Sequence, residues 1–318
     1  MNLRNLLSTP EAVVAAFLLL ATLWGTSFVA IEAGLHYFPP LLFAGVRYVV
    51  AGAVVLGYAA VAADRWIPRG RDEWLGVAVA GTFVIAAYHG FLYLGEIRIS
   101  GAVAAVVVSL SPVLTAVFAA VLLDDSLDAV AVGGFLLGLV GVAVVADFDL
   151  GGLLDADLLG IGLLLVAAAA FALGSVLSTP LRTTLADVSM QAWAMLVGAG
   201  MLFAGSIARN EPVATVEWTT TALAALAYLT LFSGVLGFLI YFALHERVGP
   251  AESNLVSYFQ PIVAALAGWA LLGQTVTETT VLGFLGIFAG FLLVKHEIVH
   301  ERLGVGGTHF APRNPVLT

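Results

Sequence analysis

The chain has 318 residues, of which 61% are hydrophobic and 10% are charged, whereas about 25% of the residues of a soluble domain are charged. This composition excludes an ordinary soluble globular protein. A net charge of -9 and a single lysine, Lys295, argue against nucleic acid or anionic lipid as the main partner, and the absence of cysteine excludes disulfide bonds, thiolate metal sites and cysteine nucleophiles.

Apolar stretches of about 20 residues, the length that a helix needs to cross roughly 30 Å of hydrocarbon, recur along almost the whole chain. Each is predicted to be a helix, because a backbone exposed to lipid has no water to satisfy its amide and carbonyl groups. The first stretch follows Arg4 as in a signal peptide, but it lacks a convincing small-residue cleavage site and is interpreted as a membrane span. Charged and turn-forming clusters separate ten segments, which in chain order are Glu11–Ala33, Pro39–Ala63, Glu73–Leu94, Ile99–Leu123, Leu127–Ala146, Leu158–Leu181, Val188–Ala208, Trp218–His245, Pro250–Leu272 and Thr277–Lys295. We therefore expect an all-α membrane protein with ten transmembrane helices.

Basic residues are distributed unevenly over the connections between these segments. With the N-terminus inside, nine of the 12 Lys and Arg residues fall on the cytoplasmic side, Arg98 and Arg209 fall on the opposite side, and Arg47 lies within a span. Because cytoplasmic loops carry the excess of positive charge, both termini of this multi-pass protein are expected on the cytoplasmic side of the cytoplasmic membrane. Residues 296–318 are expected to form a disordered cytoplasmic tail.

The sequence also contains an internal repeat. A shift of 149 positions superposes arginine, proline and glycine residues in a way that shared membrane composition does not easily explain. The pairs are Arg98 with Arg247, Pro112 with Pro261, Gly134 with Gly283, and Gly141 with Gly290. We interpret residues 11–146 and 158–295 as two copies of one five-helix unit. Five is an odd number, so the second copy must lie inverted in the membrane, as in many secondary transporters.

Several short motifs carry a family resemblance. They are Trp24-Gly25-Thr26-Ser27-Phe28-Val29-Ala30, Pro39-Pro40 followed by Arg47-Tyr48, Ser109-Leu110-Ser111-Pro112-Val113, and, in the second half, Glu252-Ser253-Asn254-Leu255 and Gln260-Pro261-Ile262-Val263. In these residues the chain resembles the EamA-type transporters of the drug/metabolite transporter superfamily. The resemblance implies ten helices around a central substrate cavity. The chain departs from the family pattern at Glu32, where a basic residue is common, and at Asp125 and Gln274, where Glu is frequent, which leaves the charge of the substrate open.

Arg47 lies several residues inside the second predicted span. An arginine at the centre of a membrane helix costs about 2.5 to 3.5 kcal/mol on insertion scales, so its side chain should face protein or a wet cavity. One interpretation is an anchor for an anionic or carboxylate substrate. The other is an ion pair or carbonyl clamp that fixes helix packing, and the sequence leaves both open.

The ninth predicted span carries the most concentrated polar face. Asn254, Ser257 and Tyr258 recur at helical spacing, with Pro261 on the same face. Polar side chains of a membrane helix point away from lipid, so we predict that this face lines the substrate site. Pro112 and Pro261 each remove a backbone donor, and both are predicted to kink their helices.

Further candidates lie on other spans. Trp24 and Ser27 share a face that suits either stacking of an aromatic substrate or plain packing, and His89 could relay protons or simply hydrogen-bond between helices. The complete set of expected substrate-binding residues is Trp24, Ser27, Arg47, His89, Ser109, Tyr241, Asn254, Ser257 and Tyr258. The glycines of the fifth and tenth spans are expected to seat these helices closely against their neighbours.

One motif is rejected. His296-Glu297-Ile298-Val299-His300 matches the zinc-binding pattern H-E-x-x-H. A catalytic zinc needs a third protein ligand and a shielded open position, but only His309 remains downstream, in a Gly- and Pro-rich tail. We expect no metal, no cofactor and no enzymatic activity.

The sequence thus favours a secondary transporter that works as a monomer in the lipid bilayer and exports small organic metabolites, such as amino acids or related compounds. A channel or facilitator for small solutes is the alternative, and a membrane enzyme is a third, less favoured interpretation. Surface acidity and the preference for Arg over Lys are typical of haloarchaeal proteins, an interpretation that stability at low salt would contradict.

Overall fold

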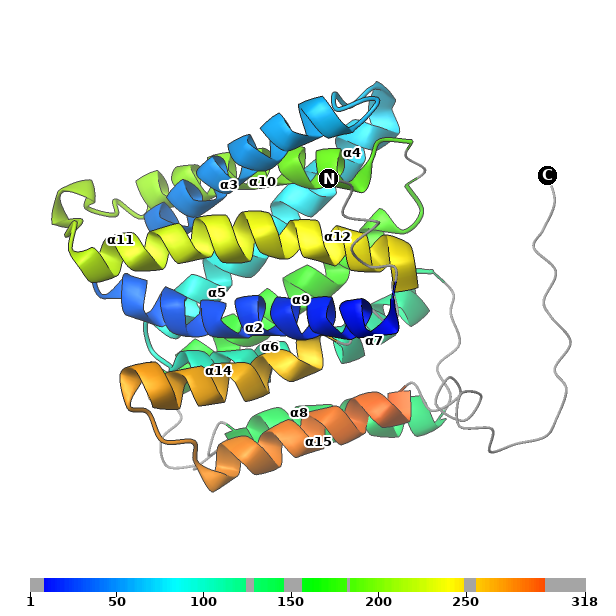
Figure 1. Ribbon diagram of the computed structural model, residues 1–318. Coiled ribbons are helices and arrows are strands. Elements are labelled where there is room, and N and C mark those ends of the chain that lie inside the picture. Colours follow the sequence, from blue (N-terminus) through cyan, green and yellow to red (C-terminus); the bar gives the residue numbers. More distant parts are fainter. Residues whose placement is uncertain (1–8, 124–128, 146–155, 182–183, 249–255, 295–318) are drawn as a thin grey trace, which may run out of the picture.

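A computed structural model describes residues 9–123, 129–145, 156–181, 184–248 and 256–294, and in these ranges all regular secondary structure is helical. The helices lie side by side in a bundle (Figure 1). In chain order they are α2 Pro10–Leu35, α3 Pro40–Ala62, α4 Gly70–Val79, η1 Ala80–Ala87, α5 Tyr88–Glu96, α6 Gly101–Val108, α7 Ser111–Leu122, α8 Ala129–Val145, α9 Ala156–Ser178, α10 Asp187–Ala208, η2 Val213–Thr215, α11 Thr220–Ala227, η3 Tyr228–Leu236, α12 Gly237–Val248, α14 Val256–Leu272 and α15 Glu278–Val294.

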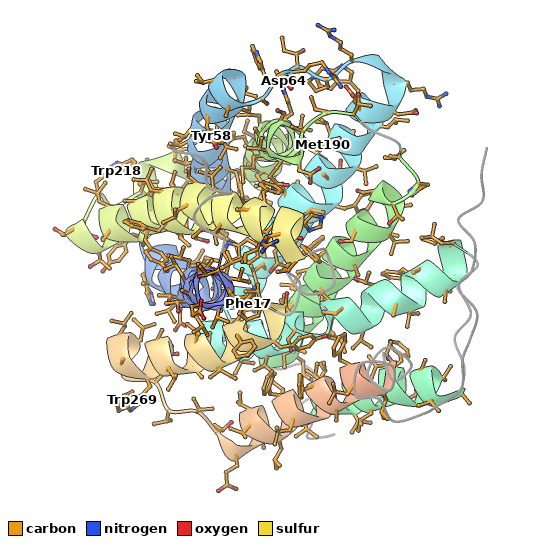
Figure 2. The ribbon with its side chains drawn as sticks, turned by 45° about the vertical axis from the view of Figure 1, so that its right-hand side comes forward. Phe17, Tyr58, Asp64, Met190, Trp218 and Trp269 are labelled. Atoms are coloured by element: carbon orange, nitrogen blue, oxygen red, sulfur yellow. The ribbon has the colours of Figure 1, made fainter. Side chains whose placement is uncertain are left out.

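Seven helical stretches are long and apolar enough to cross a membrane. Three of the expected segments correspond instead to shorter apolar helices, α8, α14 and α15, each of which borders residues outside the described ranges. Large apolar side chains are exposed around the bundle, and Trp218 and Trp269, 64% and 65% exposed, project from its periphery (Figure 2). An apolar exterior around a helical bundle is the surface that a bilayer solvates, so the protein is a multi-pass membrane protein.

The bundle has two ends, a terminal end and a distal end. At the terminal end, at the right of Figure 1, α2 begins and α15 ends. The distal end carries the connections at residues 36–39, 97–100 and 273–277. The first and the last described helix therefore meet the same end of the bundle, as an even number of crossings requires.

Two helical stretches contain π-helical segments that were not predicted. The third stretch changes from α4 to the π-helix η1, Ala80–Ala87, and back to α5, and the stretch at 220–248 contains η3, Tyr228–Leu236. Under the 149-residue shift the two segments end at equivalent positions and begin one residue apart. A π-helical turn leaves backbone groups without their usual partners and is frequent at functional sites.

The two prolines that the 149-residue shift superposes occupy different settings. Pro112 lies in the first turn of α7, because the helix is interrupted after α6 at Ser109 and Leu110. Pro261 lies inside the continuous helix α14, where its missing N–H leaves the carbonyl of Ser257 without the usual i+4 donor.

Helices from the two halves of the chain pack against each other throughout the bundle. The most extensive contacts join α8 to α15, α3 to α10, α2 to α14 and α5 to α9. The α8–α15 contact is made by glycines: a methyl carbon added at Gly134 would lie 2.5 Å from the carbonyl oxygen of Gly290, and one at Gly141 would lie 2.7 Å from that of Gly283. These two helices thus meet backbone to backbone, as small residues permit in membrane proteins.

Candidate functional site

Arg47, on α3, lies at the centre of a buried polar network. Its side chain is 3% exposed and donates from Nη1 to the Tyr93 hydroxyl at 3.0 Å and from Nη2 to Ser233 Oγ at 3.2 Å. Its guanidinium carbon lies 4.7 Å from the centre of the Tyr48 ring, a cation–π contact. Tyr93 belongs to α5 and Ser233 to η3, so the arginine connects the first half of the chain to the second.

The guanidinium retains unused donors. An arginine carries five N–H groups, and the Arg47 Nε atom is buried with no hydrogen-bond partner among the described residues. Within the same ranges the ion pairs found are Arg65 with Glu73 and Arg209 with Glu211, neither of which involves Arg47. A permanent positive charge with a free N–H group suits an anionic or carbonyl oxygen.

His89 and Tyr48 extend this network on its first-half side. The hydroxyl of Tyr48 lies 2.5 Å from His89 Nε2, and His89 Nδ1 lies 3.1 Å from the backbone carbonyl of Ile85. A carbonyl only accepts, so Nδ1 carries a proton and donates to it. The imidazole therefore connects α3 to α5 in this conformation.

Trp24 extends the network towards the second half. Its indole Nε1 donates to the backbone carbonyl of Ser233 at 3.2 Å, and its ring packs against Phe238 and Tyr241, with centroids 5.3 and 5.4 Å away. Gly237 makes this approach possible, because a methyl carbon there would lie 2.7 Å from the indole nitrogen. The π-helix η3 thus presents a carbonyl to Trp24 and a hydroxyl to Arg47 from the same residue, Ser233.

Five of the predicted residues come together in this network: Trp24, Ser27, Arg47, His89 and Tyr241. Ser27 joins it through the carbonyl of Trp24, to which its hydroxyl donates. Ser109 lies apart, at the break between α6 and α7, and its buried hydroxyl donates to the carbonyl of Val106 at 2.6 Å.

The polar face predicted on the ninth span lies elsewhere. Tyr258 packs against the rings of Phe288 and Phe291 of α15, and its buried hydroxyl has no partner among the described residues. Ser257 is partly buried on the same helix, and Asn254 falls outside the described residues. The structure therefore groups the Trp24–Arg47 candidates in one place and Tyr258 in another.

Sequence reasoning missed three residues of the network and one buried acid beside it. Tyr48 was noted only as part of a motif, and Tyr93, Ser233 and Glu96 were not selected at all. Ser233 and Tyr93 are 186 and 46 residues away from Arg47 in the sequence. Their hydrogen bonds to Arg47 therefore could not be predicted from local residue spacing. For the buried acid, the sequence offers one indication: Glu96 lies two positions after Leu94, where the apolar run of the third predicted span ends.

A cavity of about 330 Å³ opens at the distal end between the two halves. Its lining comes from the 98–103 region and Val145 in the first half, and from Ile161, Ala265 and residues 274–280 in the second. None of the eight predicted binding residues that the structure describes lines it. The cavity is therefore a distal vestibule, separate from the Arg47 network.

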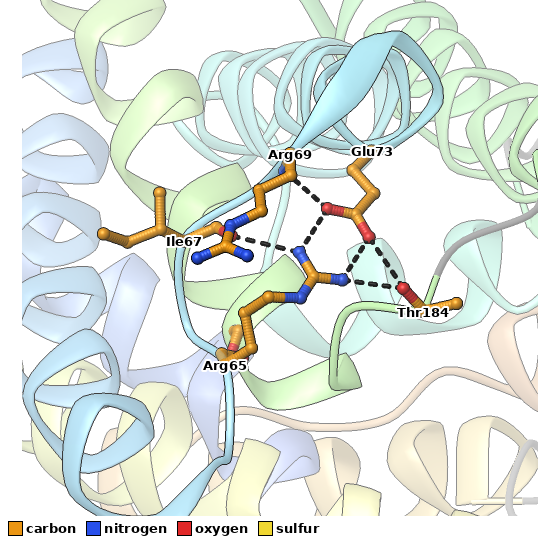
Figure 3. Close-up of polar contacts among 6 residues, drawn as sticks. Arg65, Ile67, Arg69, Glu73 and Thr184 are labelled. Carbon is orange, nitrogen blue, oxygen red and sulfur yellow. Dashed lines mark hydrogen bonds and ion pairs between the residues drawn. The ribbon is translucent and has the colours of Figure 1, made fainter.

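Polar contacts also connect the halves at the terminal end (Figure 3). Arg65 binds the Glu73 carboxylate through both Nη atoms, at 2.6 and 2.5 Å, and reaches Thr184 Oγ1 of the second half at 2.7 Å. The backbone N–H of Arg69 also donates to Glu73, at 2.6 Å. The hydrogen bonds to Glu73 raise the pKa of the Arg65 guanidinium above its ordinary value, so this residue is positively charged at every pH relevant to a cell.

A second connection lies at the distal end. The carboxylate of Glu211 accepts from the backbone N–H groups of Leu41 and Leu42, at 3.2 and 2.9 Å. An acidic group is favourable at a helix N-terminus because the first-turn amides have no intrahelical partner and the helix dipole is positive there. Helices α3 and α10 are thus joined at both ends as well as along their length.

In the described ranges no cluster of three or more His, Asp or Glu side chains could hold a metal ion.

Comparisons with known proteins place these features in context. The sequence profile of the EamA-like transporter family matches residues 12–146 and, a second time, residues 158–295. The chain is 27% identical to "Uncharacterized transporter YvbV" of Bacillus subtilis, over 92% of this chain and 94% of the relative. It is 29% identical to "Uncharacterized inner membrane transporter YedA" of Escherichia coli K12, over 87% of each.

A third relative has a more specific name. "Probable amino-acid metabolite efflux pump" of Salmonella typhimurium is 26% identical over 87% of this chain and 92% of that protein. One solved crystal structure superposes with a TM-score of 0.63 over 93% of this chain and 99% of the other, at 18% sequence identity. This last likeness concerns the fold alone.

Proposed function

This chain belongs to the EamA-like transporter family, and we propose that it is a secondary transporter that moves small organic metabolites across the cytoplasmic membrane by alternating access. Membrane transport is what its named relatives share. The observation that carries the mechanism is the contact between α8 and α15. A transporter of this kind alternates between two conformations and catalyses no covalent reaction.

The α8–α15 contact has the symmetry of an inverted repeat. Gly134 meets Gly290, and Gly141 meets Gly283. The 149-residue shift converts Gly134 into Gly283 and Gly141 into Gly290, so it exchanges the two contacts with each other. Partners that exchange in this way are related by a two-fold axis, and because the residue numbers run in opposite directions, the two helices are antiparallel.

We propose that residues 11–146 and 158–295 are two inverted five-helix repeats around this axis. The double match of the family profile and the equivalent positions of η1 and η3 support the same division. Inverted repeats provide alternating access because the two halves can exchange conformations and so open a central site to opposite sides in turn.

The substrate class follows from the Arg47 network. A buried guanidinium with an unpartnered N–H group favours a metabolite that carries a carboxylate or another anionic oxygen, and the aromatic surface of Trp24 and Tyr241 beside it suits an organic body. The name of the Salmonella typhimurium relative points to amino-acid metabolites and to efflux. We propose export of amino acids or related carboxylates.

Exchange across a membrane tests this proposal. Vesicles containing the purified protein and loaded with unlabelled amino acids should take up labelled amino acids by counterflow, with a rate that saturates as the external concentration rises. Empty vesicles and vesicles loaded with an uncharged sugar are the controls. Solute-driven conductance that does not saturate would instead identify a channel.

The proposed orientation places the terminal end in the cytoplasm. Nine basic residues against two favour this side for the termini. Tags placed after Thr318 and within the 147–157 connection should react with a membrane-impermeant reagent from opposite sides, the first only in opened cells. Labelling of both tags in intact cells would contradict five spans per repeat.

A further inference from the structure

Glu96, the last residue of α5, is a buried acid that the proposed transport site does not use. Its side chain is 4% exposed, and neither carboxylate oxygen has a hydrogen-bond partner among the described residues. An ionised carboxylate without a partner in a medium of low dielectric is costly. A buried carboxylate of this kind is stabilised by a bound proton or by a nearby cation.

Two neighbouring residues supply further oxygen atoms. Glu32, on α2, lies near enough to interact electrostatically with Glu96. It accepts from the backbone N–H of Gly101 at 2.7 Å and from the side-chain Nε2 of Gln274. The other end of that amide, Gln274 Oε1, is buried and has no donor in the described part of the chain.

The described groups that face Glu96 include few sources of positive charge. Glu96 interacts electrostatically with Glu32 of α2 and with the guanidinium of Arg47 of α3, and with Tyr88 and Tyr93 of its own helical stretch. Arg47 donates to Tyr93 and Ser233 instead. Helix α9 contributes apolar atoms, since Leu164 packs against Gly95. Arg47 is therefore the positive charge identified near Glu96 and Glu32, and its identified hydrogen bonds go to other groups.

The two acids are linked both to the distal vestibule and to the Arg47 network. Gln274 lines the vestibule and holds Glu32, Glu32 interacts with Glu96, and Glu96 interacts with Arg47.

We propose that Glu32, Glu96 and Gln274 form a binding site for a monovalent cation, either a proton or a sodium ion. The two buried carboxylate oxygens of Glu96, which have no partner among the described residues, require a proton or a cation. Carboxylate and amide oxygens are the ligands of hard cations, and a proton satisfies a pair of acids by being shared between them. Because Glu96 interacts electrostatically with Arg47, occupancy of this site would couple a cation to the metabolite, a role that rests on the proposed transport function.

Cation binding is measurable without any transported metabolite. The purified full-length protein is examined in detergent by infrared difference spectroscopy between high and low pH, and by thermal unfolding in NaCl and in KCl at equal ionic strength. A bound proton gives a carboxylic-acid carbonyl band that titrates and is lost in Glu96→Gln. A bound sodium ion gives a higher unfolding temperature in NaCl than in KCl, and that difference is lost in the same variant.

Matched variants make the outcome decisive. Glu278→Gln is the control, because Glu278 is an exposed acid at the same end of the bundle, and it should leave both signals unchanged. Glu32→Gln is the second test variant and should also shift or remove the signal. It serves as the test if the Glu96→Gln protein does not fold. Wild-type protein with neither a titrating acid band nor a sodium-dependent shift would overturn the proposal, as would signals that survive in both variants. Neither result would bear on counterflow, which tests the proposed function separately.

Discussion

Replacement of Gly134 by alanine should destabilise the protein by about 1 to 3 kcal/mol, the usual cost of forcing an extra carbon into a closely packed interior. The added methyl carbon would lie 2.5 Å from the carbonyl oxygen of Gly290 and 2.8 Å from the backbone nitrogen of Val294. Backbone atoms cannot rotate away as a flexible side chain can, so α8 and α15 would have to separate. Thermal unfolding in detergent measures the loss, and Gly290→Ala should show a similar one, because its added carbon meets Gly134 at the same distance.

The adjacent residue provides the control. A methyl carbon at Gly133 meets no atom within 4 Å, so Gly133→Ala should be neutral, or more stable by up to about 1 kcal/mol because alanine favours a helix more than glycine does. The two substitutions are chemically identical and one position apart. Equal stabilities for Gly133→Ala and Gly134→Ala would show that the close helix contact is not present in solution.

Replacement of Arg47 by lysine should weaken the apparent affinity for a carboxylate-bearing metabolite about tenfold to a hundredfold. Hydrogen bonds to charged groups contribute about 1.5 to 3 kcal/mol, and each 1.4 kcal/mol is a factor of ten in affinity. Lysine keeps the charge but has a single nitrogen, so it cannot bind Tyr93 and Ser233 and still present a planar fork to a ligand. The half-saturating concentration in counterflow measures the effect.

Arg209→Lys is the matched control for this substitution. The Arg209 side chain is 55% exposed at the distal end, so the same chemical change should leave affinity unaltered there. Arg47→Lys protein that inserts, unfolds at the wild-type temperature and exchanges with wild-type affinity would favour the other interpretation, in which Arg47 only fixes helix packing.

Much of the helical framework could be predicted from the sequence because hydrocarbon leaves the backbone one local solution. The first predicted span, Glu11–Ala33, differs from α2 by one residue at its start and two at its end, and Pro39–Ala63 differs from α3 by one at each. The π-helical segments were not predictable, since they change the backbone hydrogen bonds within a run that is apolar throughout. Pro112 and Pro261, equivalent in sequence, lie at a helix start and inside a helix, which depends on the neighbours of each.

The candidate site could be predicted only in part. Polarity inside a span selected Arg47, Trp24 and His89, because a polar group in lipid requires a partner. It could not identify those partners, since Ser233 is brought to Arg47 by tertiary packing alone. Tyr258 illustrates the converse: helical spacing indicates which face it shares but not which helix covers that face, and α15 covers it with phenylalanine rings.

The paired π-helical segments bear on the ancestry of the chain. One extra residue in an α-helix can be accommodated as a π-helical turn, and η1 and η3 end at equivalent positions of the two proposed repeats. A single insertion in an ancestral five-helix protein, followed by gene duplication, accounts for both segments, whereas two later insertions would have had to strike the same turn independently. A five-helix protein that carries a single copy of this unit should therefore contain a π-helical turn at the same place in its third helix.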